Sequence, residues 1–223
     1  MAGTRTTAVI VASALFMQNL DSAAVATALP AMARDFGESP ERLGVAVTSY
    51  LVALTVFIPL SGWIADRFGA RRVFLLAIAL FGAASAACGL AQGIGGLVAA
   101  RVAQGMAGAM MVPVGRLLLL SATPRQEMLT AMAWLTMPAM LGPITGPPLG
   151  GLLTDSFGWR SVFWINLPVA AAGLVAVAWK IAPLAPAAPG PPDLRGLGLV
   201  GGALALSMAG LETIGRGVLP HPW

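Results

Sequence analysis

Long apolar runs, separated by short segments that carry most of the charges, are the main pattern along this chain. Residues 8–29 contain only Gln18, Asn19 and Asp21 as strongly polar side chains, and residues 43–64 and 73–91 contain no charged residue. A helix of about 20 apolar residues spans the hydrocarbon core of a bilayer. The pattern predicts seven membrane-spanning helices, at 8–29, 43–64, 73–91, 96–117, 129–153, 162–179 and 197–214.

The composition supports the same interpretation. Of the 223 residues, 57% are hydrophobic and only 10% are charged, whereas a soluble domain carries about 25% charged residues. The chain has too few charges to coat a soluble domain of this size. We therefore expect a multi-pass membrane protein whose main surroundings are the lipid bilayer.

The scarcity of cysteine and histidine argues against several kinds of chemistry. Cys88 is the one cysteine and His221 the one histidine, so an intramolecular disulfide and a Cys/His metal cluster are excluded. A Ser-His-Asp triad within the apolar body is excluded too, and the lack of a phosphate-binding glycine loop argues against ATP as the energy source. We expect no enzyme, no catalytic residue, no metal and no cofactor.

The distribution of arginine indicates how the chain is oriented in the membrane. The net charge is +4, but the arginines are dispersed and mostly lie at helix ends, which argues against a nucleic-acid partner. The segment between the second and third spans carries Arg67, Arg71 and Arg72 against Asp66. Because positive loops favour the cytoplasmic side, we expect a cytoplasmic N-terminus and a location in the plasma or inner membrane.

The segment "LGPITGPPLGG" at 141–151 is rich in residues that disfavour helices in water. Within a bilayer a helix is retained, because no water competes for its backbone groups. Glycines recur every fourth residue, at 142, 146 and 150, which predicts a face that another helix can approach closely. Pro143 and Pro147 lie on an adjoining face and are expected to bend the helix. A kinked helix that serves packing alone is the alternative interpretation.

Two stretches of the chain repeat one another. Residues 59–74 and 148–163 agree at nine of sixteen positions with an offset of 89. Each copy ends one helix, turns at a glycine and starts the next helix. Because three helices separate the copies, they are expected at opposite membrane faces, as in the inverted repeats of alternating-access transporters. A stable hairpin that is merely used twice is the alternative.

Four motifs together carry a resemblance to a known family. They are "LDSAAVATALP" (20–30) with Asp21, "GWIADRFGARR" (62–72) with Gly62, Asp66, Arg67, Gly69, Arg71 and Arg72, "RVAQGMAGA" (101–109) with Arg101 and Gln104, and the 141–151 segment with Gly142, Pro143, Gly146, Pro147, Gly150 and Gly151. With these motifs the chain resembles the major facilitator superfamily. Within it, the chain is most similar to the proton-coupled multidrug antiporters of the fourteen-helix type.

The resemblance implies an all-α membrane protein with a six-helix N-terminal bundle of two inverted three-helix repeats, plus a seventh helix. We expect the bundle at 1–180, a proline-rich cytoplasmic linker at 181–196, and the seventh helix with a truncated tail at 197–223. Family members have twelve or fourteen helices, so transport is expected to need a C-terminal half that is missing here.

The resemblance also implies a function. The expected activity is export of hydrophobic or cationic small molecules by alternating access, driven by the proton gradient. The alternatives are a membrane structural or assembly module that does not transport, or a transporter of another small metabolite.

Three polar residues are the expected coupling site. Counted from the predicted helix ends, Asp21 lies about 12 Å deep and Arg101 about 8 Å deep, both in the outer half. Buried charges normally face a cavity or a partner, and burial favours the neutral form of a carboxyl group whereas water or a nearby arginine favours the ionised form. We expect Asp21 to respond to protons or cations, Arg101 to tune that response, and Gln104 to be a hydrogen-bond partner one turn away. A static ion pair that holds the helices together is the alternative.

The 62–72 segment has two interpretations. The resemblance implies a conformational latch that stabilises the outward-facing state, formed by Asp66 and the arginines. The alternative is that these arginines only determine the topology.

Overall fold

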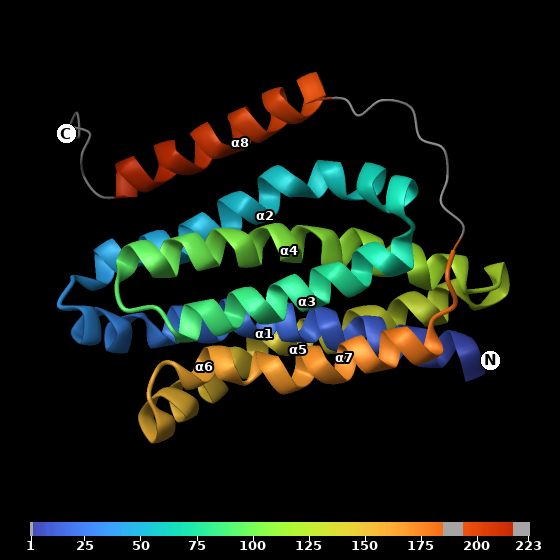
Figure 1. Cartoon of the computed structure of the whole chain (residues 1–223), viewed down its shortest axis with the longest axis horizontal. Helices are drawn as coiled ribbons and strands as arrows, with labels where there is room; N and C mark the ends of the chain where they lie inside the picture. The colour runs from blue at the N-terminus through green and yellow to red at the C-terminus, as the bar shows by residue number, and fades with distance from the viewer. Residues whose placement is uncertain (1, 185–193, 216–223) are drawn as a thin grey trace.

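The computed structural model describes residues 2–184 and 194–215, and all regular elements in these ranges are helical. They are α1 (Ala2–Phe36), α2 (Pro40–Phe68), α3 (Ala70–Gly89), α4 (Ile94–Ser121), the short 3-10 helix η1 (Arg125–Glu127), α5 (Met128–Phe157), α6 (Ser161–Trp164), α7 (Asn166–Lys180) and α8 (Leu194–Gly215). The first seven α-helices lie side by side in a bundle, and α8 lies along its outside next to α2 (Figure 1).

Six spans of the described chain are long and apolar enough to cross a membrane, and α6 and α7 together make the sixth. They confirm the first six predicted crossings. The seventh predicted helix corresponds to α8. The structure does not describe the side chains of all residues of α8. Residues 185–193 and 216–223 lie outside the described residues, so the predicted division into bundle, linker and tail stays a prediction.

The helices extend further than the apolar runs predicted. The apolar run of the first span ends at Leu29, but α1 continues through Pro30 to Phe36. α4 continues to Ser121 and α5 to Phe157. Hydropathy marks only the part of a helix that is apolar, whereas backbone hydrogen bonds continue into the polar ends. The predicted boundaries were therefore too short at these ends.

α5 remains one helix through all of its prolines, as expected for residues 141–151. Gly142, Gly146 and Gly150 are buried and face α1, which packs more extensively against α5 than against any other described helix. A Cβ atom at Gly146 would lie 2.5 Å from the Cβ of Ala23, and one at Gly150 would lie 2.8 Å from the Cα of Ala24. The glycines therefore provide the close helix approach that their spacing predicted. The bend expected from the prolines stays a prediction.

The sixth span, which the sequence predicted as one helix at 162–179, runs from Ser161 to Lys180. It is divided at the single residue Ile165, whose φ of −62° and ψ of −24° are still helical. α6 ends at Trp164 and α7 begins at Asn166, with Ile165 between them. Pro168 has no N–H to donate to the carbonyl of Trp164, and its ring crowds the preceding turn. This proline explains the break.

The two repeated segments form equivalent corners. α2 ends at Gly69 with φ of 88°, and α5 ends at Gly158 with φ of 82°. Such positive φ values favour glycine, which has no Cβ. The N–H of Gly69 donates to the carbonyl of Ala65 at 2.9 Å, and that of Gly158 donates to Thr154 at 3.0 Å. All four positions correspond under the offset of 89.

The arginines of these corners place the corners at opposite ends of the bundle. Arg71, at the start of α3, donates to the carbonyls of Val177 and Ala178 at the end of α7. Arg160, just before α6, donates to the carbonyl of Ala91, just past the end of α3. Cations at helix C-termini also interact favourably with the helix dipole. The third helix of each repeat is thus antiparallel to its counterpart, as the inverted repeat predicted.

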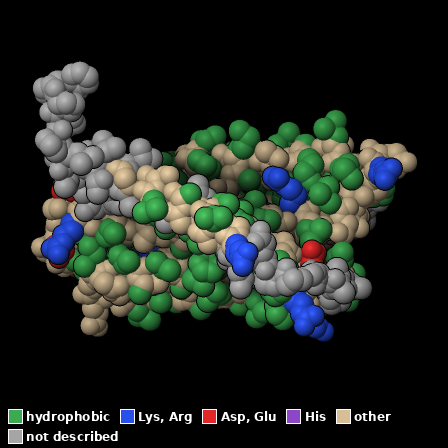
Figure 2. Space-filling view, turned by 90° about the horizontal axis from the view of Figure 1, so that it is seen from above, with side chains coloured by type: hydrophobic (Ala, Val, Ile, Leu, Met, Phe, Trp, Pro, Cys, Tyr) green, Lys and Arg blue, Asp and Glu red, His purple; other side chains and the backbone are tan. Residues whose placement is uncertain are grey.

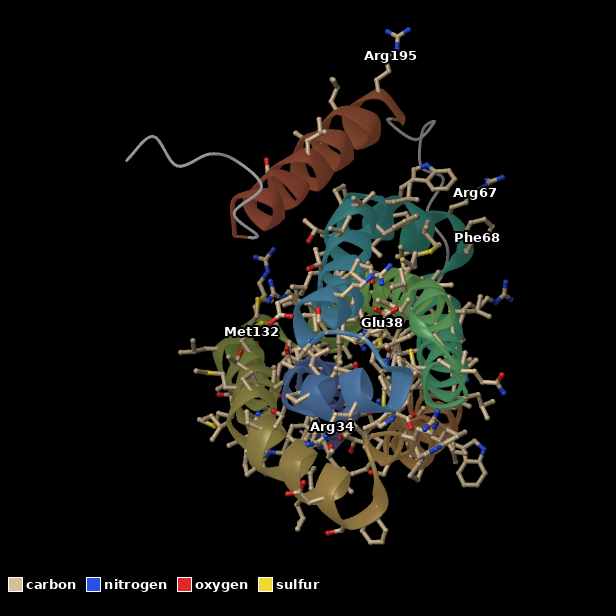
Figure 3. All side chains as sticks on the ribbon, turned by 90° about the vertical axis from the view of Figure 1, so that its left-hand side faces the viewer. Arg34, Glu38, Arg67, Phe68, Met132 and Arg195 are labelled. Carbon is tan, nitrogen blue, oxygen red and sulfur yellow. The ribbon has the colours of Figure 1, made fainter. Side chains whose placement is uncertain are left out.

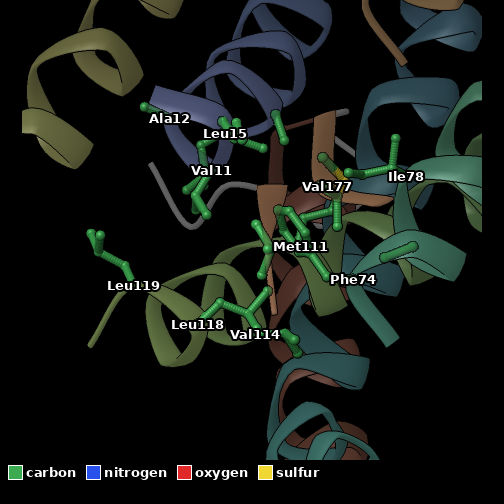
Figure 4. Packing of buried hydrophobic residues seen from close by; sticks show 14 of the residues in the cluster. Val11, Ala12, Leu15, Phe74, Ile78, Met111, Val114, Leu118, Leu119 and Val177 are labelled. Atoms are coloured by element: carbon green, nitrogen blue, oxygen red, sulfur yellow. The ribbon is translucent and has the colours of Figure 1, made fainter. Parts of the chain in front are cut away.

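The apolar core is divided into two clusters along the bundle. One cluster joins α1 up to Met17 with α3, α4 and α7, and it includes Phe74 and Met111 (Figure 4). The other joins α1 from Ala24 onward with α2, α3 and the start of α6. The residues of α1 between Met17 and Ala24 lie between the two clusters, and they include Asp21.

Candidate functional site

Five buried polar side chains form a layer between the two apolar clusters. Asp21 comes from α1, Ser85 from α3, Arg101 and Gln104 from α4, and Asn166 from α7. None of the five side chains is more than 1% exposed. Because buried polar groups are costly unless they are hydrogen-bonded, each of the five is expected to have partners. We call these five side chains the polar layer.

The charged pair of the polar layer is joined directly. Arg101 Nη1 lies 2.6 Å from Asp21 Oδ2, and both side chains are fully buried. Arg101 Nη1 also donates to Gln104 Oε1 at 2.7 Å, and Gln104 Nε2 donates to Asp21 Oδ1 at 3.0 Å. The structure therefore brings together the three residues that the sequence predicted. The spacing of three positions places Arg101 and Gln104 on one face of α4, where both can reach the same carboxylate.

Arg101 has further partners on α2. The guanidinium carbon lies 4.2 Å from the centre of the Tyr50 ring, and Nε donates to the carbonyl of Ala46 at 3.4 Å. A cation over an aromatic face is attracted to the ring electrons. Gly105 allows α4 to approach α2 closely here, because a Cβ at this position would meet the backbone of Tyr50. Nη2 of Arg101 has no partner among the described residues.

Asn166 and Ser85 are the members of the polar layer that the sequence analysis missed. Asn166 Nδ2 donates to Asp21 Oδ1 at 2.6 Å and to Ser85 Oγ at 2.9 Å. Ser85 Oγ donates to the carbonyl of Phe163 at 3.0 Å. A signal did exist, because Asn166 occupies the place of Ala77 in the first repeat, and a polar residue inside an apolar span normally needs a partner.

The depths predicted for Asp21 and Arg101 were counted from the ends of the apolar runs, and they stay predictions. Because α1 continues to Phe36, Asp21 lies fifteen residues before the end of its helix. At 1.5 Å per residue this is about 22 Å. Arg101 lies seven residues after the start of α4. The carboxylate is therefore near the middle of α1, and the long arginine side chain belongs to the same buried layer.

The residues of the 62–72 motif lie at one end of the bundle, away from the polar layer. Asp66, Arg67 and Arg72 are exposed, and Arg67 lies on the outside of the bundle beside Phe68 (Figure 3). A Cβ at Gly62 would meet no neighbour within 4 Å. The contacts of Arg71 with α7 are part of the fold described above. The latch therefore stays a prediction.

A second ion pair provides a useful contrast with the buried one. Arg160 Nη1 lies 2.8 Å from Asp35 Oδ2, with side chains 41% and 44% exposed. The same carboxylate oxygen accepts from Trp159 Nε1 at 3.1 Å. This pair ties the end of α1 to the corner between α5 and α6. Since exposed pairs contribute little to stability, its energetic weight is expected to be small.

Comparison with known proteins identifies the family. The family model described as Major Facilitator Superfamily matches residues 11–219. The chain belongs to the major facilitator superfamily. Its bundle of two inverted three-helix repeats is the N-terminal bundle of this family, and the six crossings make it a multi-pass membrane protein.

Proteins that are similar to this chain in sequence are much longer than the chain. A protein named for multidrug resistance, MdtD, from Cronobacter sakazakii is 49% identical over 170 residues, which make up 76% of this chain and 36% of that protein. The MdtD protein of Yersinia enterocolitica is 46% identical over 179 residues, 80% of this chain and 38% of that protein. The chain thus spans little more than a third of the length of these relatives.

A solved structure has the same fold as the described bundle. The POT family transporter PepTSo matches with a TM-score of 0.72 at 16% identity, over 84% of this chain and 40% of that one. At this identity the likeness concerns the fold. It agrees with the helical arrangement derived from the corners and the polar layer.

Proposed function

We propose that the chain is the N-terminal half of a proton-coupled antiporter that exports hydrophobic or cationic small molecules. The substrates would cross by alternating access, and the proton gradient would supply the energy without a cofactor. The proposal is supported by the relatives named for multidrug resistance. Transport by the whole molecule would also require a C-terminal half.

The observation that carries this proposal is the fully buried carboxylate of Asp21. Ionised Asp21 is compensated by Arg101 at 2.6 Å and by hydrogen bonds from Gln104 and Asn166. Protonation would remove the charge that holds Arg101, and so weaken the connection between α1 and α4. A cationic substrate near the carboxylate would favour release of the proton. The same group would then respond to both transported species.

The surface of the bundle is consistent with a lipid environment and a second half. Hydrophobic side chains cover much of the face seen in Figure 2, with few Lys or Arg side chains among them. α5 exposes large apolar residues along its length, including Leu129, Met137 and Ile144. Large exposed apolar surfaces mark contacts with lipid or with protein. We infer that α5 is available to a C-terminal half.

Cysteine labelling tests the proposed orientation, in which the N-terminus is cytoplasmic. Arg67 and Ser156 are exposed and lie at the two different corners, while the native Cys88 is buried. In sealed cells, an impermeant maleimide is expected to label Ser156→Cys and to spare Arg67→Cys until the membrane is opened. Labelling of both variants from one side would contradict the inverted repeat, and labelling of Arg67→Cys alone would reverse the orientation.

The proposed transport is tested with Asp21→Asn. The chain would be joined to the C-terminal half of the Cronobacter sakazakii relative. Efflux would then be measured as proton-dependent uptake of dye into everted vesicles, whose lumen corresponds to the outside of the cell. The unsubstituted fusion is expected to transport. Asparagine keeps the size of the side chain but cannot bind and release a proton, so efflux is expected to fall to the level of vesicles without the protein. Asp35→Asn, which changes an exposed acid at the end of α1, is the matched control and is expected to retain efflux.

Other outcomes of this experiment have definite meanings. Unchanged proton-dependent efflux by inserted Asp21→Asn would refute the coupling role and favour a static ion pair. Proton-dependent exchange of another metabolite, without efflux of dyes, would replace the proposed substrate class. A correctly inserted fusion that transports no tested compound would favour an assembly module.

A further inference from the structure

We propose that Asn166 responds to the protonation of Asp21 and transmits it, through Ser85, to the break between α6 and α7. In this arrangement Asn166 is a positioning residue, and Asn166 with Ser85 forms the amide–hydroxyl relay. The inference rests on the proton coupling proposed above. It assigns a role to two residues that the motifs of the chain did not include.

The relay joins the carboxylate to a different part of the bundle from its other partners. Arg101 and Gln104 both lie on α4. Asn166, in contrast, is the first residue of α7. Its second partner, Ser85 on α3, donates to the carbonyl of Phe163, two residues before the break at Ile165. The carboxylate is thus connected to both sides of the break.

The hydrogen bonds of Asn166 suit ionised Asp21 and leave one atom unsatisfied. A carboxylate offers only acceptors, and the Oγ of Ser85 also accepts, because its own hydrogen is directed to Phe163. Both partners therefore require the amide nitrogen, which lies 2.6 Å from Asp21 Oδ1 and 2.9 Å from Ser85 Oγ. The amide oxygen is left buried with no partner in the described structure. An acceptor in this condition is unfavourable and would gain from a new donor.

Protonated Asp21 supplies such a donor. A neutral carboxyl group carries one O–H, and a half-turn of the Asn166 amide about Cβ–Cγ would place its oxygen to accept that hydrogen. The hydroxyl of Ser85 could then donate to the same amide oxygen and leave the carbonyl of Phe163. The proton stays on Asp21 throughout, and only hydrogen-bond partners are exchanged. The consequence is a carbonyl beside the helix break that has lost its side-chain donor.

The break is well placed to respond. Pro168 already removes one backbone hydrogen bond that would join α6 to α7, whereas Ile165 still donates to the carbonyl of Ser161 at 3.1 Å. Helix breaks of this kind are positions where a small change in bonding alters local opening. We expect the segment around Ile165 to open more readily when Asp21 is neutral.

The other ionisable groups around the carboxylate set the conditions for this response. Arg101 from α4 is bonded to it, Tyr50 from α2 lies beneath the guanidinium, and Cys88 from α3 contacts Gln104. α7 contributes the neutral Asn166. The ionisable residues of α5 and α7 lie at the ends of those helices, at Asp155 and Lys180.

Hydrogen–deuterium exchange on the 223-residue chain in lipid nanodiscs tests the relay. The readout is the exchange of backbone amides in peptides that cover 161–170, corrected for the intrinsic dependence of exchange on pH. When the pH is lowered until Asp21 is protonated, we expect corrected exchange to rise about fivefold, which corresponds to the net loss of one hydrogen bond. Peptides from the end of α3 are expected to change little.

Three substitutions are expected to alter this response in different ways. Ser85→Ala removes the donor to Phe163, so exchange should be high at both pH values. Asn166→Leu disconnects Ser85 from the carboxyl group, so exchange should stay low at both. Asp21→Asn imitates the neutral acid with an N–H donor and should raise exchange at both. Ser61→Ala, which removes another buried hydroxyl bonded to its own helix, is the matched control and should keep the normal response.

The result that would overturn the relay is Asp21→Asn with the same exchange of the 161–170 amides as the unsubstituted chain. A response that persists in both Ser85→Ala and Asn166→Leu would overturn it too. Either result leaves the proposed function intact if Asp21→Asn abolishes efflux. Conversely, unchanged efflux in Asp21→Asn would refute the proposed function whatever the exchange data show. If Asn166→Leu does not fold, Ser85→Ala still tests the relay, because it removes only one hydroxyl group.

Discussion

Arg101→Leu is expected to destabilise the chain by about 3–5 kcal/mol, because it leaves the carboxylate of Asp21 buried without its cation. Both side chains are fully buried and their atoms are 2.6 Å apart. Removing a single partner exposes the remaining charge to the full cost of desolvation. Equilibrium unfolding in mixed detergent micelles, followed by far-ultraviolet circular dichroism, measures the loss.

A double substitution separates the charge effect from lost packing. Asp21→Asn combined with Arg101→Leu leaves no unpaired charge, so it is expected to be more stable than Arg101→Leu alone. Arg42→Leu is the control, since its pair with Glu38 is exposed and should contribute less than about 1 kcal/mol. If the two arginine substitutions cost the same, or if the double substitution costs the sum of the single ones, the buried pair does not have the energetic importance inferred here.

Gly146→Ala is expected to destabilise the chain by about 2–3 kcal/mol through overpacking between α5 and α1. A Cβ at this position would lie 2.5 Å from the Cβ of Ala23 and 3.3 Å from the backbone nitrogen of Ala24. The first distance is too short for two carbon atoms, and backbone cannot move aside as a flexible side chain can. The two helices must separate, which weakens the most extensive helix contact of the bundle. The same unfolding measurement applies.

Gly151→Ala is the matched control in the same helix. A Cβ there would lie 4.0 Å from the Cγ2 of Thr27, which is ordinary contact. Alanine is a better helix former than glycine by about 1 kcal/mol, so this substitution is expected to be neutral or stabilising. Equal stability of Gly146→Ala and Gly151→Ala would show that the α1–α5 approach is looser than the geometry indicates.

The elements of this protein could be predicted from local properties of the sequence. The lipid-facing apolar runs gave the first six crossings, and the duplicated corners gave the inverted arrangement. The helical state of residues 141–151 also followed, since a bilayer retains helices that water would not. Helix ends and the break at Ile165 were predicted less well, because backbone hydrogen bonding continues beyond the apolar part and Pro168 acts on one turn only.

The polar layer was predicted only in part. Asp21, Arg101 and Gln104 could be selected because a charge inside a span must have a partner, and spacing placed two of them on one helix face. Asn166 and Ser85 are neutral and lie outside the four motifs. Their importance depends on which atoms of α3 and α7 lie beside Asp21, and no local pattern contains that information.

The sequence by itself determined the membrane crossings, the two inverted repeats and the charged members of the polar layer, because hydrophobicity and repetition act along the chain. Only the tertiary structure decided that Asn166 and Ser85 connect Asp21 to the break between α6 and α7, and that Gly146 but not Gly151 meets α1. These are relations between helices that are far apart in sequence, and packing fixes them to within an ångström.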